Sequence, residues 1–567
     1  MNAMIATLTA LLSSLAVSAS ALADQLILCD GGADDERPYL QPDGTQRSLR
    51  IADISEDECS SIDVAARRDD VEWFALIPAT VAEHMEKGVG LLGTMNNSEF
   101  LVSEVIPATK DQPPSQELER AWPVDEDLLQ MLDITTFGIE ERVLAQSGPQ
   151  GVAISCRDGS QPAGVLLSIR DRGQPAGAEL SADIAYKSNA DFRFGFSDPD
   201  QVRQESPRLI GSLPKVSTWD TTKFMLPTIE MPGRHAFSIL CPTNRAELTI
   251  QRLVLRPADD ARAQGRATWI WRHRRWLSDP ASLVRQLKAA GMTTVYVSVP
   301  LTGSPSRVAH SDALARFIAV ASDSAIDVWA VEGDPAAITP EGKSDFRHRA
   351  RAFVTFNSDR PADQRLHGIQ YDIEPYLIRG FDLDRDGWLS AYLETLRDLS
   401  EIASVPLEAA VPFWWAELQL DAEPVIDAMA DYVDGITVMN YRTEPQQIVA
   451  NALPYLEWGH RHERLVRIAL EAGPLENQTL RSYRPSRIGR LWQVDIGGET
   501  ALLLRRFPAE NPHGPAFARS HESPVPASRT TFHGDTKRLD ALLPRLIRHW
   551  SAWPAYAGVA LHEYLPD

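Results

Sequence analysis

The sequence predicts a multidomain protein in which an N-terminal β-rich region and a β-sandwich precede a C-terminal (β/α)8 TIM barrel. Three observations predict this. The chain has 567 residues, enough for about two to four domains at roughly 150 residues each. Short strand-like runs separated by turn residues fill residues 130–258. From Ala267 onward, strand-like runs alternate with helix-like stretches, which is typical of parallel strands joined by crossover helices.

The first residues have the pattern of an export signal. An apolar stretch over residues 4–17 leads to an A-x-A cleavage pattern that ends at Ala23, so we expect a signal peptide over residues 1–23. No Lys or Arg precedes the apolar stretch, so either the signal is unusual or the true start lies upstream. A buried first helix is the alternative. No later segment has about 18 consecutive apolar residues. We therefore expect a periplasmic or extracellular protein without a membrane span once the signal is removed.

The cysteines fit an exported protein. All four, Cys29, Cys59, Cys156 and Cys241, follow the expected cleavage point, and outside the cytosol an even number favours disulfides. Four cysteines allow three connectivities. We favour pairing of nearest neighbours, because Cys156 and Cys241 each end a strand-like run, GVAISC and AFSILC. Four buried free thiols are the alternative.

Two β-rich regions are expected before the barrel. Residues 24–124 alternate short apolar runs with acidic turns and end near the linker-like stretch PATKDQPPSQ. Residues 125–262 contain the runs GVAISC, GVLLSI, ADFRFGFSD, HAFSILC and AELTIQRLVLRP. Such spacing, with few helical patterns, predicts a sandwich of antiparallel sheets.

The barrel is expected over residues 263–567. Its strand-like runs are ATWIW, TTVYVSV, DVWAVEG, GIQYDIE, LEAAVP, DGITVMNY, LVRIALEAG and AGVALHEY. Helices are expected at residues 278–291, from 311, and at 343–355, 388–403, 423–432, 445–460 and 536–550. Eight such repeats fit a closed barrel, and an open doubly wound sheet is the alternative. An insertion over residues 474–535 includes a hairpin that turns at Gly497-Gly498, and we expect it over the barrel mouth.

The charge of the chain limits its partners. The formal net charge is −22, with 44% hydrophobic and 24% charged residues. Nucleic-acid binding needs clustered Lys and Arg at phosphates, so an acidic chain argues against nucleic acid and against an anionic membrane surface. Neutral polysaccharides, oligosaccharides and small molecules remain as expected partners.

The stretch GIQYDIEPY, residues 368–376, places acids at the end of an apolar strand. Gln370, Asp372 and Glu374 alternate with apolar residues, so they share one face of the strand. Burying unpaired carboxylates is costly, but the C-terminal ends of barrel strands face the mouth, where substrates bind. Residues at the other strand ends complete the candidate site: Trp271, Glu332, Trp414, Trp415, Asn440, Tyr441, Arg442, Glu471, His562 and Glu563.

Two carboxylates flanking a bond, one protonated and one ionised, are what hydrolysis of a glycosidic bond requires. Crowding of acids at the mouth would raise at least one pKa, which suits a general acid. The C-terminal part of the chain resembles a glycoside hydrolase barrel. Chitinase-type barrels carry D-x-x-D-x-D-x-E on the fourth strand and M-x-Y-D on the sixth, where this chain has HGIQYDIE and MNYR. By this resemblance Glu374 is the acid, Asp372 its supporting carboxylate and Tyr441 a substrate contact. His367, Gln370 and Arg442 stand where that pattern has acids.

A second pattern within the same class is that of retaining barrels, with an acid/base Glu after strand four and a nucleophilic Glu after strand seven. Glu374 and Glu471 fall at those places, and Ile373 stands where that pattern has Asn. We favour the Glu374/Glu471 pair, with Asp372 in support. The strand pair ending in LVLRP just before the barrel resembles jelly-roll carbohydrate-binding modules that precede secreted glycosidases, although a purely structural sandwich is an equal alternative.

Other motifs contribute less. Trp414 and Trp415 offer a flat platform for a sugar ring, against the alternative of core packing. The run from Asp382 to Gly387 begins like a calcium loop, but its twelfth residue is Leu393 rather than Glu, so a turn that caps the next helix is favoured. The sequence contains no convincing zinc spacing and no dinucleotide or phosphate loop, so we expect no metal and no cofactor.

The sequence therefore favours an exported glycoside hydrolase that cleaves a polysaccharide or oligosaccharide by carboxylate acid/base catalysis. Trp271, Trp414, Trp415, Asn440, Tyr441, Arg442, His562 and Glu563 are the expected substrate contacts. A non-catalytic glycan-binding protein with a degenerate barrel site is the alternative. An enzyme acting on a non-sugar substrate is a third reading, because fold does not determine function.

Overall fold

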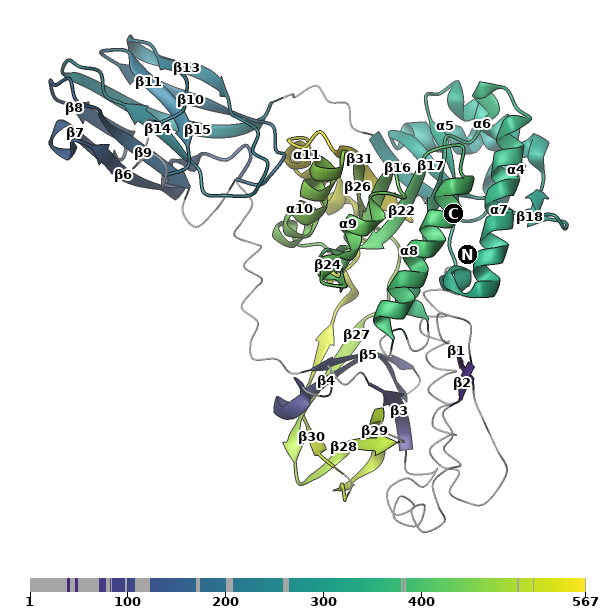
Figure 1. Ribbon diagram of the computed structural model, residues 1–567. Coiled ribbons are helices and arrows are strands. Elements are labelled where there is room, and N and C mark those ends of the chain that lie inside the picture. The colour runs from purple at the N-terminus through teal and green to yellow at the C-terminus, as the bar shows by residue number, and fades with distance from the viewer. Residues whose placement is uncertain are drawn as a thin grey trace, which may run out of the picture.

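The structure is a computed structural model that describes residues 38–40, 46–48, 71–77, 82, 84–96, 99–107, 123–169, 174–199, 207–258, 265–378, 381, 384–496, 499–512 and 514–565. It contains a closed barrel, a pair of five-stranded sheets and a seven-stranded sheet (Figure 1). The expected signal peptide, Cys29 and Cys59 lie outside the described residues.

Eight parallel strands close the barrel. They follow one another in chain order around the ring, and the first pairs with the last. The strands are β16 (Gly265–Ile270), β17 (Met292–Ser298), β20 (Asp327–Glu332), β21 (Gly368–Tyr371), β22 (Leu407–Pro412), β25 (Gly435–Met439), β26 (Leu465–Glu471) and β31 (Tyr556–His562). All eight predicted strands are confirmed in order, and the open-sheet alternative is wrong because the ring closes.

Helices connect the consecutive strands of the barrel. They are α4 (Arg274–Ser278), α5 (Pro280–Ala289), α6 (Ser311–Ser322), α7 (Pro340–Ser358), α8 (Arg385–Ile402), α9 (Val425–Met429), α10 (Pro445–His462) and α11 (Thr536–Trp550). Local signals set their ends. The Asp279 side chain caps α5 by accepting from the Ser282 amide, and Gly291, with φ +70°, follows the end of that helix. Asp384 caps α8 in the same way through the Gly387 amide, as the alternative to a calcium loop predicted.

Side chains alternate between the inside of the barrel and the surrounding helices. Trp269, Tyr296, Val331 and Ala560 form an interior cluster together with Ala267 and Ala469. Residues of the opposite parity, such as Ile369 and Val438, belong to the core between strands and helices. This period of two decides which strand-end residues can face the mouth.

The two five-stranded sheets share one core, as the predicted sandwich requires. One has the order β13-β10-β15-β8-β7 and the other β12-β11-β14-β9-β6. The strands are β6 (Leu132–Gly138), β7 (Val143–Gly148), β8 (Gly151–Cys156), β9 (Ala163–Ile169), β10 (Leu180–Ser188), β11 (Phe192–Ser197), β12 (Leu209–Leu213), β13 (Val216–Met225), β14 (Ala236–Leu240) and β15 (Ala246–Pro257). The five predicted runs correspond to β8, β9, β11, β14 and β15. The jelly-roll description stays a prediction.

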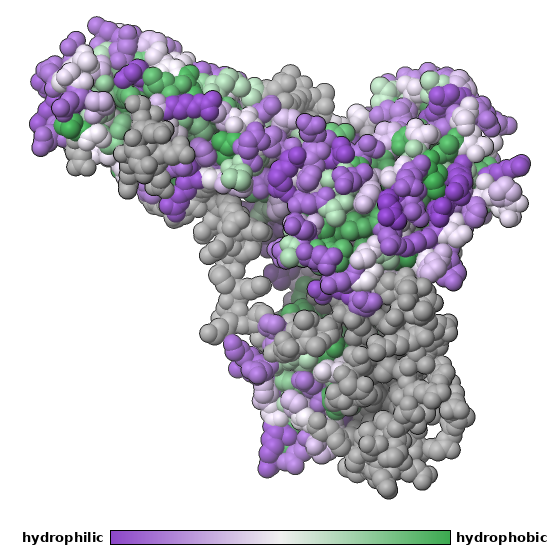
Figure 2. Space-filling model, in the orientation of Figure 1, coloured by the Kyte–Doolittle hydropathy of each residue, from purple (hydrophilic) through white to green (hydrophobic). Residues whose placement is uncertain are grey.

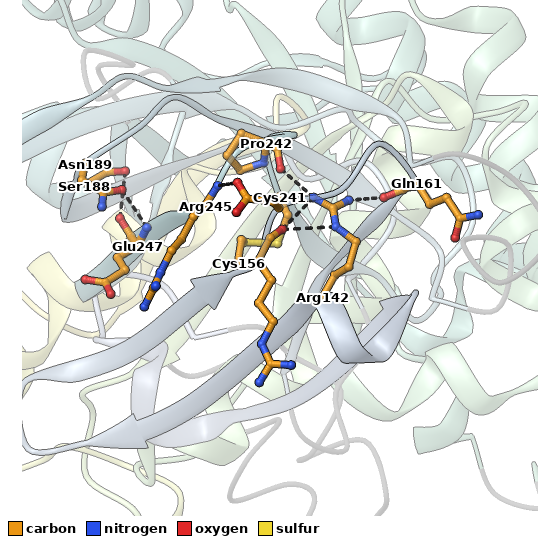
Figure 3. The surroundings of a disulfide bond; sticks show 11 residues. Arg142, Cys156, Gln161, Ser188, Asn189, Cys241, Pro242, Arg245 and Glu247 are labelled. Atoms are coloured by element: carbon orange, nitrogen blue, oxygen red, sulfur yellow. Dashed lines mark hydrogen bonds between the residues drawn. A yellow bond between two sulfur atoms is a disulfide. The ribbon is translucent and has the colours of Figure 1, made fainter.

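A disulfide joins the two sheets. Cys156 at the end of β8 pairs with Cys241, which directly follows β14, with Cα atoms 5.8 Å apart. This part of the predicted pairing is confirmed. The Arg142 guanidinium lies beside the bond and donates to the carbonyl oxygens of Arg157 and Pro242, at 3.1 and 2.9 Å (Figure 3). The buried Arg142 therefore satisfies several carbonyls where the sheets meet.

The sandwich packs against barrel helices α10 and α11 (Figure 1). Glu457 on α10 accepts from the Ala176 amide at 3.0 Å, and Trp553, just after α11, donates to the Ala176 carbonyl at 2.9 Å. Ion pairs join Glu126 to Arg545 and Asp125 to Arg548 across the same boundary. The two units thus share a specific polar contact.

The seven-stranded sheet combines two distant parts of the chain. Its order is β3-β29-β28-β30-β27-β4-β5. The strands are β3 (Val71–Leu76), β4 (Val89–Asn96), β5 (Glu99–Pro107), β27 (Gln478–Ser486), β28 (Ile488–Ile496), β29 (Glu499–Glu510) and β30 (Ala516–Val525). The predicted hairpin is confirmed, because β28 pairs antiparallel with β29. The sequence did not indicate that strands before residue 124 pair with the insertion. The domain boundaries proposed above stay predictions.

The insertion begins and ends beside the mouth. It leaves after Glu471, and on its return Phe532 donates its amide to the Glu471 carbonyl at 2.9 Å. The sheet lies below the barrel in Figure 1. The surface of the sandwich and of the barrel face turned to the viewer is mainly hydrophilic (Figure 2). Within the described residues, no helix has the length and apolar character needed to cross a membrane.

Candidate functional site

Four carboxylates gather at the C-terminal ends of the barrel strands. Asp372 and Glu374 follow β21, Glu471 ends β26 and Glu563 follows β31. Strand β21 itself stops at Tyr371, so the expectation that Asp372 and Glu374 lie within the strand is wrong. The alternation nevertheless continues past the strand end, because Tyr371 and Ile373 are buried while Asp372 and Glu374 are partly exposed. The proline after Glu374 begins a short 3-10 turn at Pro375–Leu377.

The first two carboxylates have raised proton affinities. Burial raises the pKa of Asp372 to about 6, against the opposing effect of nearby His562. Burial and then the charge of Asp372 raise the pKa of Glu374 to about 8, against a hydrogen bond from Tyr376 that lowers it. One oxygen of Asp372, Oδ1, is buried and has no hydrogen-bond partner among the described residues. Glu374 is thus held in its protonated form near neutral pH.

Glu471 has a different environment. Its Oε1 accepts from the Gly473 amide at 2.6 Å, and its Oε2 lies 2.8 Å from His562 Nδ1. The side chain is almost fully buried, with Glu471 2% exposed. Both oxygens therefore act as acceptors, an arrangement that suits the ionised carboxylate.

Two tyrosines lie among these acids. Burial, followed by the charges of Glu471, Asp372, Glu374 and Glu563, raises the pKa of Tyr441 far above its ordinary value. Burial and then Glu374 do the same for Tyr376, whose hydroxyl is a hydrogen-bonding neighbour of that carboxylate. Both hydroxyls therefore stay protonated and can donate to a ligand or to a carboxylate.

Glu563 is the exposed member of the set. Its backbone has φ +47°, a conformation that costs energy in a residue other than glycine and that recurs at functional sites. A Cβ on Gly473 would lie 2.6 Å from Glu563 Oε2 and 2.9 Å from Glu471 Oε1. The two carboxylates thus approach the same point above Gly473, and only glycine leaves room for both.

The structure brings eight of the predicted site residues to the mouth, namely the four acids, Tyr441, Trp271, His562 and Trp414. Trp271 donates from Nε1 to His562 Nε2 at 3.1 Å. Trp414 is 38% exposed and packs edge-on against Tyr376, with ring centroids 5.3 Å apart. Arg442 borders this group, stacked 4.4 Å over the ring of Phe413.

Three strand-end residues point elsewhere. The Asn440 amide is used by helix α10, donating to the Ile448 carbonyl at 2.7 Å and accepting from Asn451 at 3.0 Å. Trp415 is 0% exposed and packs on Tyr392 of α8. Glu332 forms an ion pair with Arg349 of α7, on the helix side of β20. These three side chains are therefore engaged in contacts with the surrounding helices.

Sequence reasoning missed two residues of the site. Tyr376 lies within the stretch GIQYDIEPY but beyond the strand, and only the turn at Pro375–Leu377 brings it back to Glu374. Gly473 follows Glu471 by two residues, and its role depends on the contact with Glu563, which is distant in sequence. Its position directly after a strand-end acid was the only available signal.

The comparisons with known proteins give structural similarity alone. No family model and no curated protein matches the chain. The carbohydrate-binding and GH10 modules of endo-1,4-β-D-xylanase 10B from Clostridium thermocellum, solved with xylohexaose, match at 10% identity and a TM-score of 0.25, covering 62% of this chain and 81% of that chain. The spore cortex-lytic enzyme SleL of Bacillus cereus matches at 9% identity and a TM-score of 0.30, covering 55% and 73%. A mutant of the family 29 carbohydrate-binding module, solved with cellulohexaose, matches at 13% identity and a TM-score of 0.17, covering 22% and 79%. At these values the similarity carries no argument about activity.

Proposed function

We propose that this chain is an exported glycoside hydrolase with a barrel of the (β/α)8 type, acting on a polysaccharide or oligosaccharide. The observation that carries the proposal is the contrast between two carboxylates at one barrel mouth. The pKa of Glu374 is raised to about 8 by burial and by Asp372, whereas both oxygens of Glu471 accept hydrogen bonds. Glycoside hydrolysis needs one protonated and one ionised carboxyl group on either side of the bond.

In this proposal Glu374 protonates the glycosidic oxygen as the leaving sugar departs. Asp372 keeps Glu374 protonated by like-charge repulsion. Glu471 stabilises positive charge at the sugar ring and acts as nucleophile or as base toward water. Tyr441 and the exposed Trp414 contact the sugar, and the Cys156–Cys241 disulfide fits an oxidising compartment outside the cytosol.

The test is the release of reducing ends from a panel of bacterial and plant polysaccharides. Wild type and Glu374→Gln are compared at equal concentration, with Glu401→Gln, an exposed acid on α8, as the matched control. We expect release by wild type and Glu401→Gln and a loss of roughly 10²- to 10⁴-fold in Glu374→Gln. Release that is equal in all three proteins would remove Glu374 from the chemistry.

A second candidate is a glycan-binding protein without turnover. The burial of Glu471, 2% exposed with both oxygens engaged, favours it, because a carboxylate so enclosed is difficult for a substrate to reach. Calorimetric titration with the same panel of polysaccharides distinguishes the hydrolase from the binding protein. Binding of a glycan by wild type without release of reducing ends would support this second candidate.

A further inference from the structure

His562 uses both ring nitrogens within the protein. Nδ1 lies 2.8 Å from Glu471 Oε2, and Nε2 lies 3.1 Å from the indole nitrogen of Trp271. Strand register contributes to this, because Glu471 on β26 and His562 on β31 are direct partners. Both ring nitrogens therefore have partners within the protein, and the role of His562 as a substrate contact stays a prediction.

The partners determine where the proton of the imidazole lies. An indole N–H can only donate a hydrogen bond, so Nε2 must accept from Trp271. A neutral imidazole carries its proton on the other nitrogen, so Nδ1–H donates to Glu471. The alternative tautomer would place two N–H groups against each other at Nε2 and leave Glu471 Oε2 without a donor.

Packing holds the ring in this orientation. Trp269 and Trp271 contact it edge-on, with ring centroids 5.7 and 6.2 Å away, and the tilted ring of Tyr441 lies at 6.1 Å. The imidazole is buried, at 5% exposure for His562. A flip of the ring would exchange both nitrogens for carbons at their partners, so the observed orientation is the one that satisfies all three groups.

We propose that His562 is a positioning residue for Glu471, which fixes the direction of that carboxylate, and that Trp271 acts through His562 by setting its tautomer. This inference rests on the proposed function for its kinetic consequences. Its structural part, the Trp271–His562–Glu471 chain, can be tested without any activity.

The charges that face His562 come from several elements. Burial lowers its pKa, but Glu471, Glu563 and Asp372 outweigh burial, and the net direction is upward. Trp271, from the end of β16, opposes protonation, because a proton on Nε2 would break its hydrogen bond. Loss of the indole N–H should therefore raise the pKa of His562 further.

The kinetic test uses two substitutions at one position. His562→Asn can place an amide N–H close to the position of Nδ1, whereas His562→Leu fills the space without a donor. If His562 positions Glu471, kcat falls roughly 10- to 100-fold in His562→Leu, while KM changes little and His562→Asn recovers a substantial part of kcat. If the ring only packs, the apolar leucine retains more activity than the polar asparagine, and the proposal is overturned.

The direct test is imidazole ¹⁵N NMR of the full chain, with Trp271→Phe as the second variant. In the neutral ring of wild type, observed above the pH at which His562 titrates, we expect a protonated Nδ1 and an unprotonated Nε2. We expect protonation at a higher pH in Trp271→Phe. A protonated Nε2 in the neutral ring of wild type, or an unchanged titration in Trp271→Phe, would contradict the proposal. If wild type cleaves no glycan, the proposed hydrolase function fails, while the NMR result still decides the role of Trp271 and His562.

Discussion

Two carboxylates from neighbouring segments of the barrel, Glu408 within a strand and Glu374 beyond the end of the adjacent strand, show how differently the same group can be used. Glu408 on β22 lies deep in the barrel. Its Oε1 accepts from Tyr296 at 2.7 Å and from Gln370 at 2.6 Å, and Thr437 adds a third donor. The buried Arg467 is close enough for its charge to interact with that of Glu408. Glu408 is therefore surrounded by hydrogen-bond donors and lies near a buried cation, which suits a structural carboxylate.

Glu374, after β21, has no such set of donors. Burial, together with the charge of another acid, Asp372, raises its pKa to about 8. The neighbours of Glu408 are thus hydrogen-bond donors and a cation, whereas the neighbours of Glu374 disfavour its charge. The roles of the acids in this barrel therefore depend on their neighbours. The acid whose neighbours disfavour its charge is the candidate for proton transfer.

Replacing each carboxylate with its amide tests this difference between Glu374 and Glu408 and gives the largest expected effects. Glu374→Gln should lower glycan cleavage roughly 10²- to 10⁴-fold without a loss of stability. Glu408→Gln leaves Arg467 without its buried counter-charge and should lower the free energy of unfolding by about 3–5 kcal/mol. Urea denaturation measures the stability of each variant, and reducing-end release measures its cleavage activity. Equal stability losses in the two variants would show that the distinction is wrong.

Gly473→Ala tests the geometry of the mouth. The new Cβ would lie 2.6 Å from Glu563 Oε2 and 2.9 Å from Glu471 Oε1, so at least one carboxylate must move. We expect a fall in kcat of roughly 10- to 100-fold, since small displacements of reacting groups are costly. Gly233→Ala, whose Cβ would meet nothing closer than 3.5 Å, is the control. Full activity in Gly473→Ala would mean that Glu471 and Glu563 need no fixed position.

The adjacent Trp414 and Trp415 provide a smaller effect on binding. Trp415→Ala should cost about 3–5 kcal/mol of stability, because a fully buried ring is lost from the core. Trp414→Ala should leave stability nearly unchanged and raise the KM for a glycan about 2- to 10-fold, the size of one aromatic contact. Thermal denaturation measures the stability of each variant, and initial rates at several glycan concentrations give its KM. If the KM is unchanged in both variants, Trp414 is not a platform for a sugar ring.

The last prediction concerns the dependence of stability on pH. The pKa of Glu374 in the folded protein lies above its ordinary value of 4.5, at about 8, so the folded state binds this proton more tightly than the unfolded state. Its contribution to stability is present below about 4.5 and is lost as pH rises through about 8. Wild type should therefore lose stability relative to Glu374→Gln across this range. A stability difference that stays constant from pH 4.5 to pH 8 would contradict the raised pKa.

Much of the barrel could be predicted from sequence because each strand is a short apolar run followed by a helix with clear end signals, such as Asp279 and Gly291 around α5. The period of two placed Gln370 and Asp372 on one face, and the structure confirms that Gln370 points inside, to Glu408. The sheet formed by β3–β5 and β27–β30 could not be predicted, because its pairing joins segments hundreds of residues apart.

The site was only partly predictable for a related reason. Position at a strand end identified Glu374, Glu471 and His562, but it could not distinguish side chains that face the mouth from those that face helices. Asn440 and Glu332 end strands yet bind α10 and α7. Which way a residue past the strand turns depends on tertiary contacts, and the same holds for Trp415, which differs from its neighbour Trp414 only in the direction of its side chain.

The most direct test of the central claim, that Glu374 is the proton donor, compares two leaving groups on the sugar that wild type is found to release. Cleavage of the polysaccharide requires a proton on the departing oxygen, whereas dinitrophenolate departs without one. We predict that Glu374→Gln loses roughly 10²- to 10⁴-fold on the polysaccharide and far less on the dinitrophenyl glycoside. An equal loss on both substrates would contradict the account, because Glu374 would then act in a step other than protonation of the leaving group.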